Sequence, residues 1–392
     1  MKEGWEYKKL GEVCSIERGG SPRPISDYIT NAEDGINWIK IGDAVEGSKY
    51  IMSTAEKIKP EGMKKSRFVH KGDFILSNSM SFGKPYILGV NGCIHDGWLV
   101  IHDDNNTFNK DFLYYYLGSP TIYSEFKRLA VGGVVNNLNS NLVRGVKVAI
   151  PPLSEQQHIV EELDLLSSII EKKKAQLDEL DNLAQSLFYE MFGDPITNEK
   201  GWEVMKLKDA CTCITDGDHM PPPKVDKGIP FITISNIDKH FREIDFRETF
   251  FVPQSYYDSI KEERKAQKGD VLYTVTGSYG IPIIVNENIK FCFQRHIALF
   301  RPNNLLISSC FLCYWALCKS IKFMADDVAT GIAQKTVGLS SLRKFPMIIP
   351  PLDLQQQFAS KIEAVEHQKE LIKQSIKEVE TLFNSRMDYF FN

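Results

Sequence analysis

Two closely similar stretches, AIPPLSEQQ at 149–157 and IIPPLDLQQ at 348–356, decide how this sequence folds. Each places a proline pair after an apolar run, and such a pair can neither continue a strand nor enter a helix interior. Ser154 and Asp353 follow the pairs, with Gln157 and Gln356 three residues later. This is the pattern of a helix capping box. We therefore expect a hinge at each proline pair and a capped helix after it.

Beyond each hinge, apolar residues recur at alternating spacings of four and three, which predicts a coiled-coil seam. The two seams share one register, and their apolar positions are Ile159, Leu163, Leu166, Ile170, Leu177, Leu180, Phe358, Ile362, Val365, Ile372, Ile376 and Val379. The alternative is two amphipathic helices that pack separately on their own domains, but their period would drift toward 3.6. Lys173 and Lys369 also occupy seam positions, where they could fix the register or extend out of the seam.

The hinge is one of several stretches that occur twice. GWEYKKLGEVCSI at 4–16 matches GWEVMKLKDACTC at 201–213, GINWIKIGD at 35–43 matches GIPFITISN at 228–236, and KGDFILSNSMSFGKPYI at 71–87 matches KGDVLYTVTGSYGIPII at 268–284. A repeat of this length indicates two copies of one unit, each a globular domain followed by a helix. We therefore expect the opening segment at 4–14 to occupy in the first domain the place that 201–211 occupies in the second.

Short β-rich stretches bounded by Gly, Pro, Asp and Asn alternate with helical stretches inside each copy. WIKI, DFILS, FITI and DVLYTVT indicate strands, whereas KDFLYYYLGSP and SSCFLCYWALCKS indicate helices. We predict an α+β fold with two pseudo-symmetric mixed α/β domains at 1–153 and 193–352. Helices at 154–192 and 353–392 separate the domains and form an antiparallel coiled coil.

The charge distribution permits a DNA partner without demonstrating one. The formal net charge is -4, but acidic residues concentrate in the two helical segments, so the globular parts are mildly basic. The charged start MKEGWEYKKLGE has no apolar core, and no apolar run approaches the ~18–20 residues of a membrane helix. These features predict a cytoplasmic protein with no membrane association.

The order of these motifs resembles the specificity subunits of type I restriction-modification systems. The resemblance rests on GWE and KLGE near the start, KGD followed by a glycine and a proline, and IPPL with QQ before a long helix. It extends over the whole chain, because both copies of the unit show it. It implies two target-recognition domains, each reading one half of a split site in double-stranded DNA. It implies that the helices set the gap and dock two modification (methyltransferase) subunits, with restriction subunits in the full complex. It also implies that the chain is not catalytic and binds no cofactor, S-adenosylmethionine and ATP being held by partner subunits.

A search for catalytic motifs supports a non-catalytic role. There is no GxxxxGK[ST] phosphate-binding loop and no NPPY-like tetrapeptide, which leaves a stand-alone DNA methyltransferase or nuclease as the alternative function. Asp73 and Asp270 could be nuclease carboxylates or turn residues before strands. Cys310, Cys313 and Cys318 could bind a metal, but the second CxxC and histidines of a zinc site are missing. An apolar helix explains these cysteines more simply, and we expect no metal site.

The loops that differ between the copies are the candidate base-reading segments. GGSPRPIS at 19–26 corresponds to DGDHMPPPK at 216–224, SNSMSFGKPY at 77–86 to TVTGSYGIPI at 274–283, and 95–97 to 294–296. The candidate DNA-binding residues are Arg23, Lys40, Asn78, Ser79, Lys84, His219, Lys224, Thr276, Ser278, Tyr279, Arg295 and His296. Each could equally lie in a solvated loop or turn. Tyr114, Tyr115 and Tyr116 could stack on bases or belong to a helix core.

Overall fold

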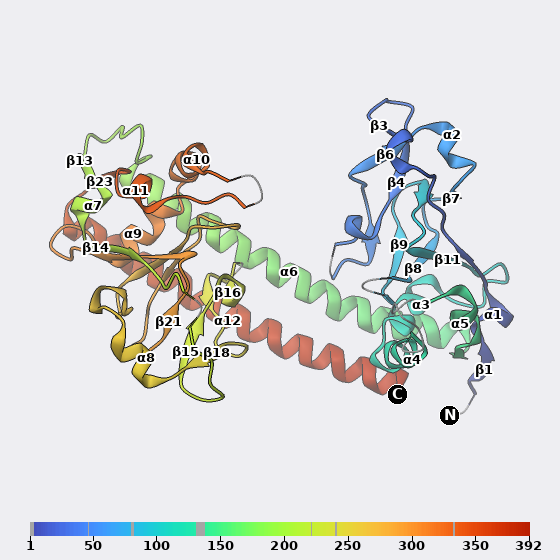
Figure 1. Cartoon of the computed structure of the whole chain (residues 1–392). Coiled ribbons are helices and arrows are strands. Elements are labelled where there is room, and N and C mark those ends of the chain that lie inside the picture. The colour runs from blue at the N-terminus through green and yellow to red at the C-terminus, as the bar shows by residue number, and fades with distance from the viewer. Residues whose placement is uncertain are drawn as a thin grey trace. The chain divides into compact units, whose positions relative to one another are not determined.

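The chain consists of two compact units in a computed structural model that describes residues 4–45, 47–79, 82–130, 138–220, 222–239, 241–331 and 334–392. Unit 1 comprises Met1–Lys173 and Ser375–Asn392, and unit 2 comprises Lys174–Gln374 (Figure 1). Each unit therefore contains one globular domain together with one part of each long helix.

The described part of unit 1 is built on two five-stranded sheets and one two-stranded ribbon. In order, the sheets are β2 (Ser15–Arg18), β11 (Trp98–His102), β8 (Phe74–Ser77), β9 (Pro85–Leu88), β5 (Tyr50–Ile51); then β3 (Ile29–Thr30), β6 (Glu56–Ile58), β4 (Ile36–Ile39), β10 (Gly92–Ile94), β7 (Arg67–Val69); and β1 (Glu6–Lys9) with β12 (Lys147–Ile150). The helices are α1 (Leu10–Val13), η1 (Ile25–Asp27), η2 (Ile41–Asp43), α2 (Pro60–Met63), α3 (Lys110–Leu117), α4 (Pro120–Ala130) and α5 (Ser140–Gly145).

Unit 2 repeats the central arrangement with shorter sheets within its described residues. The sheets are β14 (Cys211–Asp216), β22 (Ile297–Pro302), β19 (Val271–Thr274), β20 (Pro282–Ile284); β18 (Phe250–Val252), β15 (Ile229–Ile232), β21 (Cys292–Phe293); β16 (Ile237–Asp238) with β17 (Glu243–Ile244); and β13 (Glu203–Lys206) with β23 (Pro346–Ile349). The helices are α7 (Leu207–Ala210), η3 (Ile234–Asn236), α8 (Gln254–Ser259), η4 (Glu262–Arg264), α9 (Ser309–Ala316), α10 (Lys319–Val328) and α11 (Leu339–Leu342).

The duplicated N-terminal segments make the same contact in each unit. Strand β1 pairs antiparallel with β12, and Glu6 lies opposite Ile150. Strand β13 pairs with β23 in the same way, and Glu203 lies opposite Ile349. Each ribbon holds the start of its domain against the strand that leads into the hinge, so the expectation from the repeat is confirmed.

The central strands are buried on both faces because successive side chains of a strand point to opposite sides. In β8, Phe74 and Leu76 join the cluster that packs against α3 and the long helices, whereas Ile75 joins the cluster between the two larger sheets. Strand β19 of unit 2 divides its side chains similarly, with Tyr273 on one face and Leu272 on the other. These two-sided strands form the rigid frame that carries the loops.

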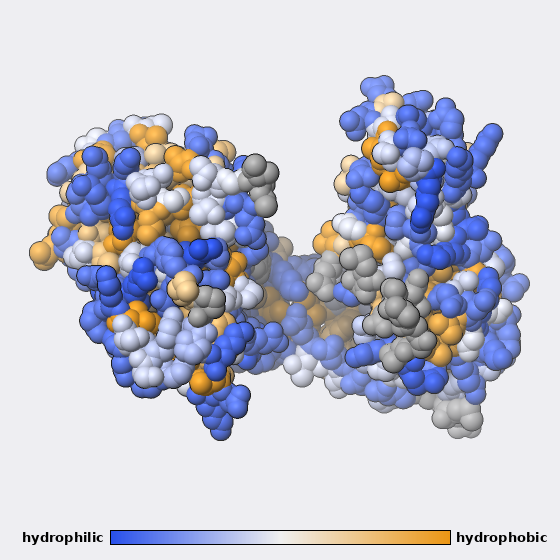
Figure 2. All heavy atoms as spheres, viewed as in Figure 1, coloured by the Kyte–Doolittle hydropathy of each residue, from blue (hydrophilic) through white to orange (hydrophobic). Residues whose placement is uncertain are grey.

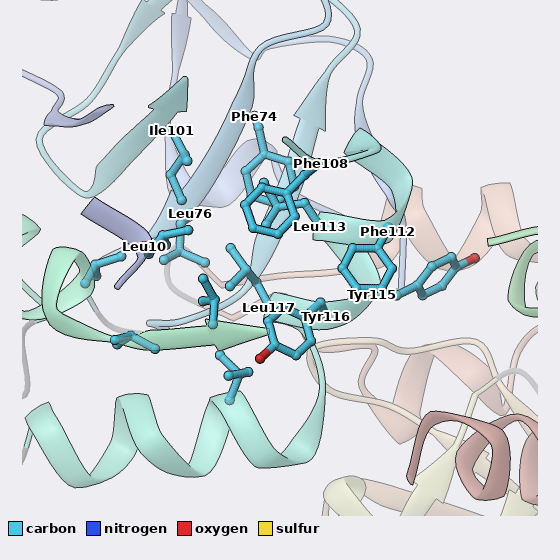
Figure 3. Close-up of a cluster of buried hydrophobic side chains, with 14 of the residues drawn as sticks. Leu10, Phe74, Leu76, Ile101, Phe108, Phe112, Leu113, Tyr115, Tyr116 and Leu117 are labelled. Atoms are coloured by element: carbon cyan, nitrogen blue, oxygen red, sulfur yellow. The ribbon is translucent and has the colours of Figure 1, made fainter. Parts of the chain in front are cut away.

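The tyrosines at 114–116 belong to this core, as the simpler interpretation predicted. Tyr115 and Tyr116 are 5% and 6% exposed and pack beside Phe112, as Figure 3 shows. The Tyr115 hydroxyl donates to Asp164 at 2.5 Å, and the Tyr116 hydroxyl accepts the backbone N–H of Ala149 at 2.8 Å. Because their hydroxyls bond within the protein, these two rings tie α3 to its neighbours and do not form a stacking platform.

The long helices are α6 (Leu153–Phe192) and α12 (Leu352–Phe391), shown in green and red in Figure 1. Eight of the twelve predicted apolar seam residues are buried and the other four are half-buried. No helix in the described part of the chain combines the length and apolarity required to span a membrane.

The two helices pair in antiparallel fashion within each unit. In unit 2, Phe188 and Phe192 of α6 contact Phe358 of α12, whereas Asp181 binds the Nζ of Lys369 at 2.9 Å. In unit 1, the guanidinium of Arg386 pairs with the Glu162 carboxylate, with Nη2 to Oε2 at 3.0 Å. As the residue numbers increase along α6, the numbers of their contact partners on α12 decrease, which is the pattern of an antiparallel pair.

Lys369 fixes the seam in unit 2. It is 2% exposed, and its ammonium bonds Asp181 of the facing helix as well as Glu366 of its own helix at 3.0 Å. A buried lysine between two carboxylates sets the register of the pair, since sliding the helices would leave the charge unpaired. Of the two alternatives for this residue, the register role is the one the structure supports.

The ends of both helices also pack on the globular domains, so the alternative of separate packing holds in part. Ile159 and Val160 of α6 and Phe390 and Phe391 of α12 join the main core of unit 1. The same happens in unit 2, where Phe188 lies against Phe311 of α9 with ring centroids 5.5 Å apart. The helices are thus anchored in the domains as well as paired with each other.

The predicted capping boxes are wrong, because α6 begins at Leu153 and α12 at Leu352. The glutamine that holds each hinge is instead the residue immediately before the predicted cap partner. The fully buried amide of Gln156 accepts from the N–H of Asn109 and donates to the carbonyls of Thr107 and Pro151, at 2.7–3.0 Å. Gln355 makes the same three bonds to Ser308, Leu306 and Pro350. Each glutamine therefore bonds the hinge to the loop before a helix of its domain, α3 in unit 1 and α9 in unit 2.

Candidate nucleic-acid interface

Parts of the three predicted base-reading loops of unit 1 meet, at residues 19–23, 77–79 and 95–97. Together with Arg18, which precedes the first of them, we call these segments the unit 1 loop edge. The N–H of Gly19 donates to the Trp98 carbonyl at 2.9 Å, and the N–H of Asn78 donates to the Gly97 carbonyl at 2.9 Å. A Cβ at residue 19 would collide with the carbonyl oxygen of His95, so only glycine permits this approach.

Asp96 is the electrostatic centre of the unit 1 loop edge. Its carboxylate accepts the Ser21 hydroxyl at 2.9 Å and lies 3.0 Å from the Nε2 of His95. The guanidinium groups of Arg23 and Arg18 lie 3.6 and 3.8 Å from its second oxygen. Two separate loops therefore contribute the acid and the cations of one cluster.

The protonation states in this cluster follow from its contacts. Burial would raise the pKa of Asp96, but the Ser21 hydroxyl and the neighbouring His95, Arg18 and Arg23 lower the pKa below its ordinary value. Burial lowers the pKa of His95, which the charges of Lys40, Arg18 and Arg23 reinforce and Asp96 opposes. A neutral His95 accepts the Gly97 N–H at Nδ1, at 2.9 Å, and so carries its proton on Nε2, toward Asp96.

Unit 2 builds the same edge from residues 216–219, 275–279 and 294–296, which we call the unit 2 loop edge. The N–H of Gly217 donates to the Ile297 carbonyl at 3.3 Å, as Gly19 does to Trp98. The N–H groups of Asp218 and Arg295 close the loop contact through the carbonyls of Phe293 and Asp218, at 2.8 and 3.0 Å. The backbone frame is therefore repeated, while the side chains on it differ.

The charged groups of the unit 2 loop edge are arranged around Asp216 and Asp218. Asp216 lies 2.9 Å from the Nε2 of His219 and 3.5 Å from the guanidinium of Arg264, which also lies 3.7 Å from Asp218. Arg295 is exposed. Burial, together with the charges of Arg295 and His219, lowers the pKa of His296, so these groups lie in one electrostatic neighbourhood.

The predicted DNA-binding residues differ in how much surface they present. Arg23, His219, Lys224, Ser278 and Arg295 are exposed, whereas Lys40, Ser79, Lys84, Tyr279 and His296 are half-buried. Residues 80–81 and 221, within the predicted loops, lie outside the described residues. Figure 2 shows hydrophilic residues over much of the visible surface of both units.

Two predicted contacts are buried instead of exposed, and this is a correction. Asn78 is fully buried, with its amide donating to the Asp96 carbonyl at 3.2 Å. Thr276 is 7% exposed and bonds the Thr336 hydroxyl at 3.2 Å. Each of these side chains bonds a distant segment of its own unit, and so holds two loops together.

Other predicted residues are engaged within the protein. The Lys40 ammonium binds Glu56 at 2.5 Å, and the Lys224 ammonium lies 4.6 Å from the centre of the Phe250 ring. Tyr279 donates to Asp326 at 2.6 Å, and Ser278 accepts from Lys239 at 2.7 Å. These contacts orient the side chains without removing them from the surface.

The sequence prediction included Asp96 and Asp216 in its candidate segments without singling them out, and it missed Arg18 and the neighbouring Arg264. Arg18 and Asp216 share one position of the repeat, as do Asp96 and Arg295, since the backbone bonds of their neighbours match. The sign of charge is reversed at both positions. Comparing charges across the aligned copies would have found this exchange.

The remaining candidate centres lie in turns and in the core. Asp73 and Asp270 each accept a backbone N–H three residues earlier, from His70 and Gln267, at 2.8 Å, as turn residues before a strand do. Cys313 and Cys318 are buried, and burial raises the pKa of both thiols to about 12. Among the described residues no group of three or more His, Cys, Asp or Glu is placed to hold a metal ion.

A duplicated α/β domain with a charged three-loop edge, carried on paired helices, defines a class of two-domain recognition proteins. The family model described as type I restriction modification DNA specificity domain matches the chain twice, at residues 2–182 and 199–381. These ranges cover most of the sequence. The chain belongs to this family and contains two copies of its domain.

Known relatives resemble the chain along most of its length. The EcoBI specificity subunit of a type I restriction enzyme from Escherichia coli is 21% identical, over 93% of this chain and 79% of its own. The MjaIX specificity subunit from Methanocaldococcus jannaschii is 22% identical, over 93% and 87%. A solved structure concerned with complex assembly and conformational transition of the type I restriction-modification system has a TM-score of 0.55 and 19% identity, over 100% and 98% of the two chains. This likeness shows a shared fold.

Proposed function

We propose that this chain is the DNA-reading subunit of a type I restriction-modification complex. Each globular domain reads one half of a bipartite site in double-stranded DNA through its loop edge. The helices α6 and α12 set the gap between the halves and dock two modification subunits, which restriction subunits join in the full complex. The chain itself performs no catalysis, and the complex works on DNA in the cytoplasm.

The duplicated loop edge is the observation that carries this proposal. Both units use matching backbone bonds, through Gly19 and Gly217, to hold two loops together. The side chains on this shared frame differ between the units, as two readers of different base sequences require. The relatives above, which are specificity subunits of type I restriction enzymes, support the same assignment.

The cofactors of the complex belong to its partner subunits in this proposal. S-adenosylmethionine binds the modification subunits and ATP the restriction subunits, and the sequence contains neither an NPPY-like tetrapeptide nor a phosphate-binding loop. The helices offer the partners a surface with exposed carboxylates, including Glu161, Glu171 and Glu179 of α6 and Glu363 of α12. The carboxylates of Asp73 and Asp270 hold turns, so they give no support to a nuclease function.

Reconstitution tests this division of labour. Purified alone, the chain should neither methylate nor cleave DNA at stoichiometric concentration. Mixed with its modification subunits and S-adenosylmethionine, it should direct adenine methylation to one bipartite sequence. The measurement is methyl transfer to duplex DNA followed by mapping of the modified base. Turnover by the isolated chain would contradict the proposal and favour a stand-alone enzyme.

A further inference from the structure

The two carboxylate oxygens of Asp96 have different partners. Oδ1 is fixed, because the Ser21 hydroxyl and His95 Nε2 lie 2.9 and 3.0 Å from it. Oδ2 faces Arg23 and Arg18 at 3.6 and 3.8 Å, beyond the ~2.7–3.2 Å of an ordinary N–H hydrogen bond. Asp96 therefore orients both guanidinium groups electrostatically and leaves their donors largely unused.

The two arginines remain accessible at the surface. The side chains of Arg23 and Arg18 are 82% and 51% exposed. The Nε of Arg18 donates to the backbone carbonyl of Asp96 at 2.8 Å, which restrains the guanidinium through a nitrogen other than the terminal pair. Paired terminal nitrogens suit the O6 and N7 acceptors of guanine, which arginine binds in a bidentate manner.

We propose that Asp96 is a positioning residue for sequence recognition by unit 1. It presents Arg18 and Arg23 to the base edges of one half-site and thereby determines the base read there. This inference rests on the proposed function, because it assumes that the unit 1 loop edge faces DNA.

A carboxylate at this edge is otherwise unfavourable. DNA phosphates repel a negative charge, and a surface selected only for affinity would carry cations alone. Asp96 nevertheless lies beside two arginines, with the guanidinium groups of Arg23 and Arg18 at 3.6 and 3.8 Å from its carboxylate. One oxygen of its carboxylate ties Ser21 to the 95–97 loop, and the other faces the two arginines. In this proposal, the ordering of the arginines improves specificity at the expense of attraction to phosphate.

In the unit 2 loop edge the charges are exchanged, so an exposed arginine, Arg295, lies on the loop that carries Asp96 in unit 1. Asp216 stands at the position of Arg18, and Arg295 stands at the position of Asp96. Arg295 is held by its backbone N–H on Asp218, and its side chain is exposed. The two units therefore offer arginine donors from different points of the same frame, which predicts two unlike half-sites.

The test is the Asp96→Asn substitution in the chain assembled with its modification subunits. Binding to a duplex without the site should strengthen, since one negative charge is removed. Discrimination at one base of the unit 1 half-site should fall about tenfold, which corresponds to roughly 1.4 kcal/mol. The unit 2 half-site should not change. Motif mapping by methylome sequencing and titration of matched and mismatched duplexes give the two readouts.

Two control variants isolate the positioning role. Asp34→Asn removes the same charge from an exposed position of unit 1, and it should leave the discrimination of both half-sites intact. Arg295→Ala should relax only the unit 2 half-site. Together they separate a general charge effect and a unit 2 effect from the presentation of Arg18 and Arg23.

The outcomes distinguish this inference from the function beneath it. A wild-type complex without a bipartite motif would overturn both. A wild-type motif that Asp96→Asn leaves unchanged, or a uniform gain in affinity with full discrimination, would overturn the positioning role alone. If Asp96→Asn fails to fold, Arg18→Ala and Arg23→Ala decide, since both side chains are exposed. Unaltered discrimination in both of those variants would likewise overturn the role.

Discussion

Replacing Asp270 by asparagine should cost unit 2 about 3 kcal/mol of folding free energy. Asp270 is 2% exposed, and its two oxygens bind Nε and Nη2 of Arg301 at 2.9 and 2.8 Å. The same carboxylate accepts the Gln267 N–H at 2.8 Å. Removing one partner of a buried ion pair leaves the other charge uncompensated, which typically costs ~3–5 kcal/mol. We expect the lower end, because the Arg301 side chain is 22% exposed.

The repeat supplies a matched control at Asp73. It holds the same turn through the His70 N–H at 2.8 Å, but the side chain beside it is an imidazole that is 72% exposed and 3.9 Å away, in place of a bidentate arginine. Asp73→Asn should therefore cost only about 1 kcal/mol. Hydrogen exchange resolved by peptide measures both, and Asp270→Asn should lower protection in unit 2. Equal losses would contradict the argument, and a stable Asp270→Asn protein that has lost a DNA-cleavage activity would support the nuclease alternative.

Inserting one heptad after Lys174 and another after Gln374 should lengthen the gap in the DNA site by about three base pairs. These points lie within one residue of where the chain passes between the compact units, and whole heptads preserve the seam. Seven residues add about 10.5 Å of helix, and each base pair adds about 3.4 Å. The two half-sites should stay the same. Their rotation about the DNA axis changes by about 100°, so binding should also weaken.

A smaller insertion in one helix is the control for the proposal that helix length sets the gap. Four residues after Lys174 alone add about 6 Å but introduce a stutter that the pair must absorb by local unwinding. We expect a gap longer by about two base pairs and weaker docking of the modification subunits. Methylome sequencing of both variants reads the gap directly. An unaltered gap would show that the helices do not set the spacing, and altered half-sites would show that they affect recognition itself.

The repeat, the hinges and the helix register could be predicted because their signals are local and occur twice. The seam positions of the two helices were predicted from spacing alone, and eight of the twelve are buried while four are half-buried. The turn role of Asp73 and the core role of Tyr115 are similarly local. Each depends on residues within a few positions or on the apolar face of one helix.

The parts that escaped prediction depend on contacts between distant segments. Gln156 looks like a neighbour of a capping residue in the sequence, yet its amide bonds Thr107 and Asn109. Asp96 binds Ser21, which is 75 residues away. Periodicity does not reveal such pairs, because a loop side chain has no fixed direction until its partner loop is in place. The burial of Asn78 has the same origin, since its amide bonds the Asp96 carbonyl.

Exchange of one domain tests the central claim most directly. The first globular domain of this chain is replaced by that of a relative with a different target, and the helices and the second domain are retained. Cells carrying the hybrid with the modification subunits are then examined by methylome sequencing. The account predicts that one half of the bipartite motif changes while the other half and the gap stay the same. A hybrid that changes both halves, or neither, would contradict the assignment of one half-site to each unit.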